Sequence, residues 1–166
     1  IYVTGGDVQS NSVPTTYDSL SVSGTNGAGN PSTYNANAAL TLNGGFSVFD
    51  SGVLNANSDI TATQGVDVSS GGVLNLNVGT LSAQSISLSG IGSAVQNGGH
   101  FTVGSGNLRL FNGVTLIYGS GDSVTTQARI DSSATLTLAQ NLTLSDWLYL
   151  SNGGSIARTS QTISAQ

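Results

Sequence analysis

The residues best suited to bind another molecule are few, and two arginines stand out among them. Arg109, Arg129 and Tyr149 follow one another at equal intervals along the sequence. If each interval corresponds to one coil of the chain, the two guanidiniums become neighbours and could receive a carboxylate or a sulfated glycan. Asp131, two positions after Arg129, offers a second interpretation, a salt bridge within the chain. The spacing favours the salt bridge.

The sequence contains no set of residues that could carry out catalysis together. General acid–base cleavage of a polysaccharide needs two carboxyl groups within reach of one another. His100, the single histidine, lies in an Asn-Gly-Gly-His turn with no acidic residue beside it in the sequence. The aspartates are scattered, and no two are expected in one column on consecutive coils: they are Asp7, Asp18, Asp50, Asp59, Asp67, Asp122, Asp131 and Asp146. We therefore expect no enzyme, no metal site and no cofactor.

Composition excludes further classes of function. The chain of 166 residues contains no cysteine, so it has no disulfide framework, zinc finger or iron–sulfur site. Its net charge of −5 argues against a nucleic-acid partner. No apolar run approaches the roughly 18 residues of a membrane helix, so we expect no membrane insertion by this segment. Charged residues make up only 7%, which argues against ordinary amphipathic helices.

The elements that position the arginines are short strands. Apolar and polar residues alternate in triplets such as Leu20-Ser-Val22, Leu40-Thr-Leu42 and Leu108-Arg-Leu110, each soon followed by Gly, Asn or Ser. Alternation of this kind is typical of half-buried β-strands, and the small polar residues are typical of turns. The sequence predicts an all-β chain.

An internal repeat orders these strands. Residues 46–57 match residues 66–77, and the register continues with steps of 20, 22, 20 and 20 to Ile86, Leu108, Ala128 and Leu148. Because three strand positions keep this period, we predict a single-stranded parallel β-helix with three short strands per coil and about seven coils. The solenoid is expected over residues 19–166, with a corner loop at 24–31. Residues 1–18, with Pro14 and a broken alternation, are expected to form an N-terminal flank or cap.

Asparagines recur in two columns of the expected coil. A ladder of amides bonded to one another is the favoured interpretation, and a glycan-binding strip is the alternative. The columns are Asn35, Asn55 and Asn75, and Asn37, Asn57, Asn77 and Asn97.

Large aromatic residues interrupt the polar outer surface. Phe49 and Phe111 fall in one outward column three coils apart, and Tyr149 follows Arg109 and Arg129 in another. Exposed apolar groups of this size often mark contact surfaces. The favoured interpretation is that each ring packs over its own corner, and contact with a partner is the alternative. Phe49, Phe111, Arg109, Arg129 and Tyr149 are therefore the candidate binding residues.

Several segments resemble a known style of bacterial protein. Val66–Gly72, Leu74-Asn-Leu-Asn77 and Leu148–Gly154 resemble passenger regions of Gram-negative autotransporters and haemagglutinin-type repeats of two-partner-secreted adhesins. The resemblance covers about residues 19–166. It implies a right-handed β-helix, extracellular or on the outer cell surface of a Gram-negative bacterium, that acts as an adhesin or self-associating stalk.

The resulting hypothesis is a non-catalytic fragment of a secreted or surface protein that works through its lateral faces. Its partner would be a second copy of itself or glycans of host or bacterial surfaces. One alternative is a structural subunit that stacks end to end in an extracellular fibre, because exposed strand edges are templates for pairing. A polysaccharide-binding or polysaccharide-degrading β-helix is a third class.

Overall fold

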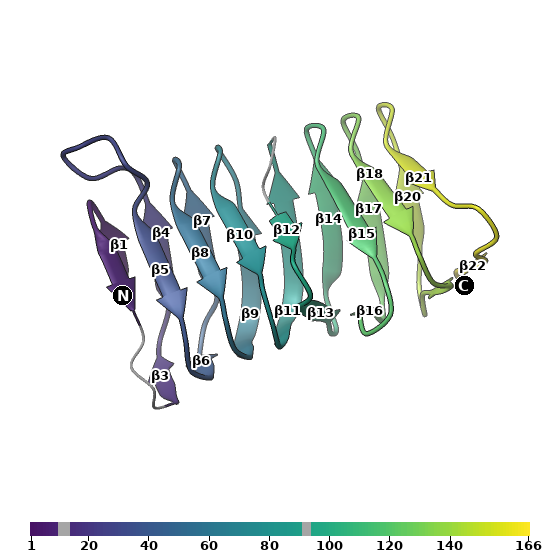
Figure 1. Ribbon diagram of the computed structural model, residues 1–166. Coiled ribbons are helices and arrows are strands. Elements are labelled where there is room, and N and C mark those ends of the chain that lie inside the picture. Colours follow the sequence, from purple (N-terminus) through teal and green to yellow (C-terminus); the bar gives the residue numbers. More distant parts are fainter. Residues whose placement is uncertain (10–13, 91–93) are drawn as a thin grey trace.

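Most strands pair in parallel with the equivalent strand one coil later, which builds the elongated solenoid of Figure 1. The computed structural model describes residues 1–9, 14–90 and 94–166, and within these ranges it contains strands but no helix. The all-β fold and the parallel stacking at intervals of about 20 residues are thus confirmed. In the described ranges no helix is long and apolar enough to cross a membrane.

One long sheet runs the length of the rod. Its main row consists of β1 (Tyr2–Thr4), β4 (Leu20–Ser23), β7 (Phe46–Phe49), β9 (Ile60–Val68), β11 (Thr80–Ser89), β14 (Asn107–Phe111), β17 (Gln127–Ile130) and β20 (Leu148–Leu150). The strands β9 and β11 are long enough to join this row to a second one, which contains β3 (Thr15–Tyr17), β6 (Leu40–Leu42), β13 (His100–Val103) and β16 (Ser123–Val124). The two rows therefore form one sheet of 12 strands.

The remaining strands form three smaller sheets. Five strands pair in one sheet: β2 (Asp7–Gln9), β5 (Thr33–Ala36), β8 (Val53–Ala56), β10 (Val73–Leu76) and β12 (Ala94–Gln96). Three pair in another: β15 (Thr115–Tyr118), β18 (Thr135–Leu138) and β21 (Ser155–Ala157). The last pair is β19 (Leu142–Thr143) with β22 (Ile163–Ser164).

The core is a stack of aliphatic side chains inside the coils. Phe46, Val66 and Ile86 follow one another in register along the long sheet, and all three are buried. Leu54 and Leu74 form the equivalent stack in the five-stranded sheet. Alternate residues point outward, so most strands bury one face as their sequence predicts. The last coil is different: Leu148 and Ile156 are only partly buried and Leu150 is 46% exposed.

A tight turn recurs where the main row of the long sheet passes to the next sheet. Its two central residues have positive φ, as in Ser70 and Gly71 (50° and 77°) and Asn152 and Gly153 (48° and 81°). The next position is glycine in several coils because the preceding coil passes close by. A Cβ at Gly72 would collide with the carbonyl oxygen of Val48. The asparagines and glycines at these corners therefore adopt the left-handed backbone conformation that the turn requires, and they allow neighbouring coils to stack closely.

The solenoid has about eight turns rather than the seven expected, because it begins before residue 19. The strands β1, β2 and β3 pair with β4, β5 and β6, so a further coil precedes the predicted one. Its register was hard to recognise, since the sequence offset between paired strands changes within this coil. Tyr2 of β1 pairs with Ser21, whereas Asp7 of β2 pairs with the more distant Thr33. Residues 24–31, which leave the rod as the large loop of Figure 1, account for the difference.

The longer step between Ile86 and Leu108 marks a discontinuity in the stack. The five-stranded sheet ends at β12, and the three-stranded sheet begins at β15. Asp122 is buried at this junction and accepts hydrogen bonds from the backbone N–H groups of Phe101 (2.9 Å) and Gly119 (2.8 Å). The register also shifts here: Val103 pairs with Val124, 21 residues on, whereas Ile86 pairs with Leu108, 22 residues on. A buried carboxylate thus joins the two parts of the rod.

Candidate functional site

The predicted outward column containing the arginines exists along the main row of the long sheet. We call it the arginine column; from the first coil to the last it reads Tyr2, Ser21, Ser47, Asp67, Ser87, Arg109, Arg129 and Tyr149. Two residues earlier in each coil a parallel column begins, in which Gly65 pairs with Ser85 and Asn107 with Gln127. Both columns change from small to large residues at the same coil, between β11 and β14.

The small residues create a hollow along the first half of this face. We call it the trough: its volume is about 540 Å³, its floor includes Ser21, Ser47, Gly65 and Ser87, and the exposed Tyr2 stands at one end. Serine hydroxyls and backbone atoms share this floor with apolar atoms of residues such as Phe46 and Val66, and Asp67 is its charged residue. The trough therefore offers hydrogen-bond donors and acceptors beside apolar contact surface.

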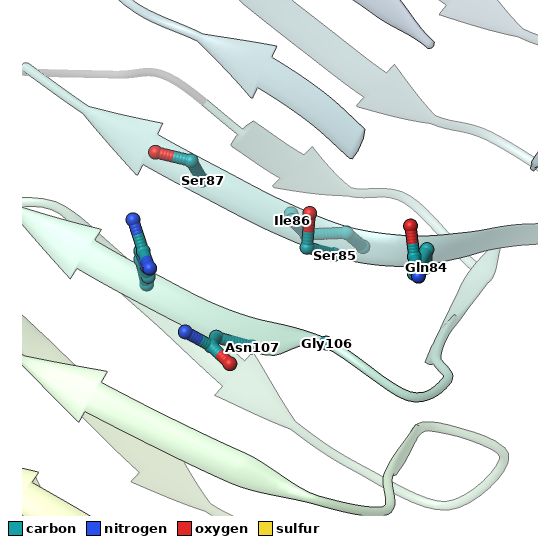
Figure 2. A pocket seen from close by; sticks show the side chains of 7 residues that line it. Gln84, Ser85, Ile86, Ser87, Gly106 and Asn107 are labelled. Atoms are coloured by element: carbon teal, nitrogen blue, oxygen red, sulfur yellow. The ribbon is translucent and has the colours of Figure 1, made fainter. Parts of the chain in front are cut away.

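A second hollow lies where the residues become large. This Arg109 pocket has a volume of about 290 Å³ between β11 and β14. Ser85 and Ser87 come from β11, and Asn107 and Arg109 come from β14. Figure 2 shows the side chains of Ser85, Ser87 and Asn107 along the two neighbouring strands. Ser87 belongs to both hollows, so the pocket continues the trough.

Arg109 is exposed and held in place by amides. With the Asn107 amide oriented so that its nitrogen donates to Gln127 Oε1 (2.6 Å), its oxygen accepts from Arg109 Nη2 (3.0 Å) and Nε (3.2 Å). Gln127 in turn donates through Nε2 to Asp146 Oδ2. This relay fixes the guanidinium, and no carboxylate of the described residues lies within salt-bridge distance of it.

Arg129, one coil further, is used by the protein itself. Its Nη2 lies 2.8 Å from Asp131 Oδ2, as the sequence favoured. The guanidinium carbon also lies 5.5 Å from the centre of the Phe111 ring and 5.2 Å from that of Tyr149. Such stacking stabilises a cation between aromatic faces. Arg109 and Arg129 therefore do not form the paired receptor for one carboxylate that the sequence also allowed.

Asp131 is the carboxylate that pairs with Arg129. Its carboxylate is buried and accepts from Arg129, from Asn152 Nδ2 (2.8 Å) and from the backbone N–H of Ser132 (2.6 Å). The Arg129 hydrogen bond, with help from Asn152, holds the pKa of Asp131 well below its usual range. Asp131 is therefore a structural anion at neutral pH.

The aromatic candidates differ in their surroundings. Phe49 is half-buried beside Ser23 in the neighbouring coil, whereas the half-buried Phe111 lies under Arg129. Tyr149 is 48% exposed and meets Trp147 edge-on, with the ring centres 6.3 Å apart. Phe111, Arg129 and Tyr149 thus share one cluster, while Phe49 lies three coils away.

His100 has an acidic neighbour, contrary to the expectation from sequence. Its Nδ1 lies 3.7 Å from Asp122 Oδ1, because the following coil brings residue 122 beside residue 100. Asp122 also accepts from Gln96 Nε2 (3.1 Å), in addition to its two backbone donors. Burial, reinforced by the nearby Asp122 charge, raises the pKa of the Tyr118 hydroxyl above its usual value. These contacts give Asp122 a structural role at the junction between the five-stranded and the three-stranded sheets.

The trough was missed at the level of sequence. Gly45 and Gly65 resembled turn residues, and Ser47 and Ser87 resembled ordinary outward serines. One feature of the sequence could have revealed it: two neighbouring outward columns contain small residues on the same coils and then large residues on the following coils. That coincidence becomes visible only when the columns are aligned side by side.

Comparison with known proteins gives no relative for this chain: no family profile, curated protein or solved structure matches it.

Proposed function

We propose that this protein is a non-catalytic stalk of a bacterial surface or secreted protein that attaches to its partner through the outer face of the long sheet. The observation that carries the proposal is the coincidence of trough, Arg109 pocket and exposed aromatic residues on that one face. An adhesin needs a rigid support and a lateral binding surface, and the solenoid supplies both. The resemblance to autotransporter passengers and haemagglutinin-type adhesins supports an outer-surface location.

The roles of the carboxylates on this face support binding rather than catalysis. Asp131 is committed to Arg129, and Asp146 bonds to Gln127. Asp67 accepts from Ser69 Oγ (2.9 Å) and faces the trough beside serines and glycine. Hydrolysis of a glycosidic bond by paired carboxylates requires a second acid positioned opposite the first. Asp67 instead fits the role of a hydrogen-bond acceptor for a bound partner.

Attachment can be tested with beads that carry the whole chain. Ser87→Trp would fill the junction of trough and pocket, and Ile117→Trp, at an exposed position of β15 on another sheet, is its matched control. We expect Ser87→Trp to abolish attachment of the beads to one another or to cells, and Ile117→Trp to leave attachment unchanged. Circular dichroism of both variants verifies the fold. Equal attachment by both variants would contradict the proposal.

The same variants distinguish lateral attachment from the end-to-end fibre. Growth of particles with concentration in sedimentation, unaffected by Ser87→Trp, would indicate contact through strand edges. Loss of bead attachment in Ser87→Trp alone would assign the contact to the long sheet.

A further inference from the structure

The Arg109 pocket combines one available cation with uncharged walls that are partly polar and partly apolar. A guanidinium has five N–H donors, and the Asn107 oxygen accepts from Nη2 and Nε of Arg109. The remaining donors are available to a ligand. A planar carboxylate suits them because it can accept two parallel hydrogen bonds from one guanidinium.

Arg109 differs from each of the other two arginines in one respect. Arg129 is paired with Asp131, whereas the exposed Arg158, which donates from Nη1 to the carbonyl oxygen of Gln161 (2.7 Å), lines neither the trough nor the Arg109 pocket. The relay through Asn107 and Gln127 to Asp146 holds the Arg109 side chain without neutralising it by direct contact. Preorganisation of this kind lowers the entropy cost of binding.

The walls indicate what carries the carboxylate. Ser85 and Ser87 border the pocket, and both can donate to and accept from hydroxyl groups. The trough continues from Ser87 towards Tyr2 with a similar mixture of hydroxyl, backbone and apolar atoms. Sugars present both hydroxyl groups and C–H faces, so a mixed hollow that extends over several coils fits a linear chain of sugars.

Asp67 restricts where a bound chain of sugars can carry negative charge. In the arginine column it precedes Ser87, so it lies two coils from Arg109, roughly 10 Å at the usual strand spacing. A carboxylate beside Asp67 would be repelled, whereas a sugar hydroxyl could donate to it. A polymer with a negative charge on every unit, such as a nucleic acid, would place charges at both positions.

We infer that the Arg109 pocket binds the carboxylate of an acidic sugar within a linear glycan whose next sugars are neutral and lie along the trough. This inference rests on the proposed function and names the partner class of the same face. The recognised chemistry is one acidic sugar followed by a run of neutral sugars, because a second carboxylate two sugars along would lie beside Asp67.

Calorimetry with three hexasaccharides tests this inference on the whole chain. A hexasaccharide with one glucuronate at one end and five neutral glucose units carries a single carboxylate, its carboxyl-reduced form lacks the charge, and a hexamer of glucuronate carries a charge on every sugar. We expect the native protein to bind the first at least about tenfold more tightly than the other two, as a charged hydrogen-bonded contact implies.

Two arginine variants separate specific recognition from net charge. Arg109→Gln should lower the affinity for the singly charged hexasaccharide about tenfold or more and leave that for the reduced form unchanged. Arg158→Gln removes the same charge from the last coil and should bind as the native protein does. Equal losses in both variants, or equal affinity of the native protein for the charged and reduced forms, would overturn the inference.

The inference and the proposed function fail in different ways. If no hexasaccharide binds while bead attachment still depends on Ser87, the lateral face is functional and the glycan is wrong. If attachment then disappears after protease treatment of the target cells, the partner is a protein. If bead attachment does not depend on Ser87 while Arg109-dependent glycan binding persists, the pocket is a glycan site and the attachment surface lies elsewhere.

Discussion

Two polar columns of the same solenoid use repetition in opposite ways. In the asparagine ladder, Asn55 Nδ2 donates to Asn35 Oδ1 and Asn75 Nδ2 donates to Asn55 Oδ1, both at 2.7 Å. The arginine column instead places Ser87, Arg109 and Arg129 on successive coils, so Arg109 lies between a serine and a second arginine that is already paired. Identical amides satisfy one another, whereas unlike neighbours leave donors available.

The comparison suggests where binding sites arise in a solenoid. A ladder of equal residues uses its hydrogen bonds along the rod, and the second asparagine column does the same at 2.7–2.9 Å from Asn37 to Asn97. This confirms the ladder geometry that the sequence favoured. A change of residue size and charge from one coil to the next creates a hollow with an uncommitted cation. The break in the repeat is therefore the part to examine for function.

The largest effect is expected beneath the ladder, in the core. Leu74 is buried in register with Leu54, so Leu74→Asp would place an unpaired carboxylate among aliphatic side chains and cost several kcal/mol, on the order of 3–5. Asn75→Asp, one residue on, disrupts only the amide ladder and should cost about 1–2 kcal/mol. Urea denaturation of both variants measures the difference. Equal midpoints would show that the inward and outward residues of β10 have been exchanged.

The next effect concerns the cluster beyond Arg109. Asp131→Asn removes the anion that Arg129 and Asn152 hold, so the urea midpoint at pH 7 should fall clearly below that of the native protein. Asp50→Asn, at an exposed turn position, removes the same charge and should change the midpoint little. A similar fall in both variants would assign the effect to net charge instead of the cluster.

The acid dependence of Asp131 follows from its lowered pKa. The folded-state pKa lies below the unfolded value of about 3.9, so the stabilisation is complete above that value and is lost as the pH falls from there through the folded pKa. The native and Asp131→Asn midpoints should therefore differ at neutral pH and approach each other progressively as the pH falls below about 4. A difference that stayed constant down to about pH 2 would contradict the assignment.

The ladder itself permits a graded test. Asn55→Ala removes one hydrogen bond to Asn35 and one to Asn75, at a part-buried position, and should cost about 2 kcal/mol. Asn97→Ala removes the single bond to Asn77 at an exposed position and should cost about 1 kcal/mol or less. Thermal unfolding of the two variants provides the ranking. If Asn97→Ala were the more damaging change, the ladder would not be the source of the stability.

Sequence reasoning worked where residues repeat and failed where coils differ. The inward stack of Leu54 and Leu74 follows directly from their spacing, because parallel strands must place equivalent residues over one another. The first coil was missed, since the loop at 24–31 changes its offset. The contact between His100 and Asp122 was missed because it depends on how the coils join after the longer step of the repeat. Spacing also could not show that Arg129 stacks on aromatic rings, which depends on side-chain rotamers.

The smallest effects separate the two phenylalanines of the outward column. Phe49→Ser removes a half-buried ring with a serine neighbour, whereas Phe111→Ser also removes the face on which Arg129 lies, a contact worth about 0.5–1 kcal/mol. We therefore expect Phe111→Ser to lower the unfolding temperature slightly more than Phe49→Ser. If the rings also contact a partner, the double variant should weaken self-association in sedimentation and aggregation assays while its unfolding temperature falls by only a few degrees. A large loss of stability would assign both rings to the fold, and unchanged association would remove this column from the attachment surface and leave the trough and the Arg109 pocket as its binding region.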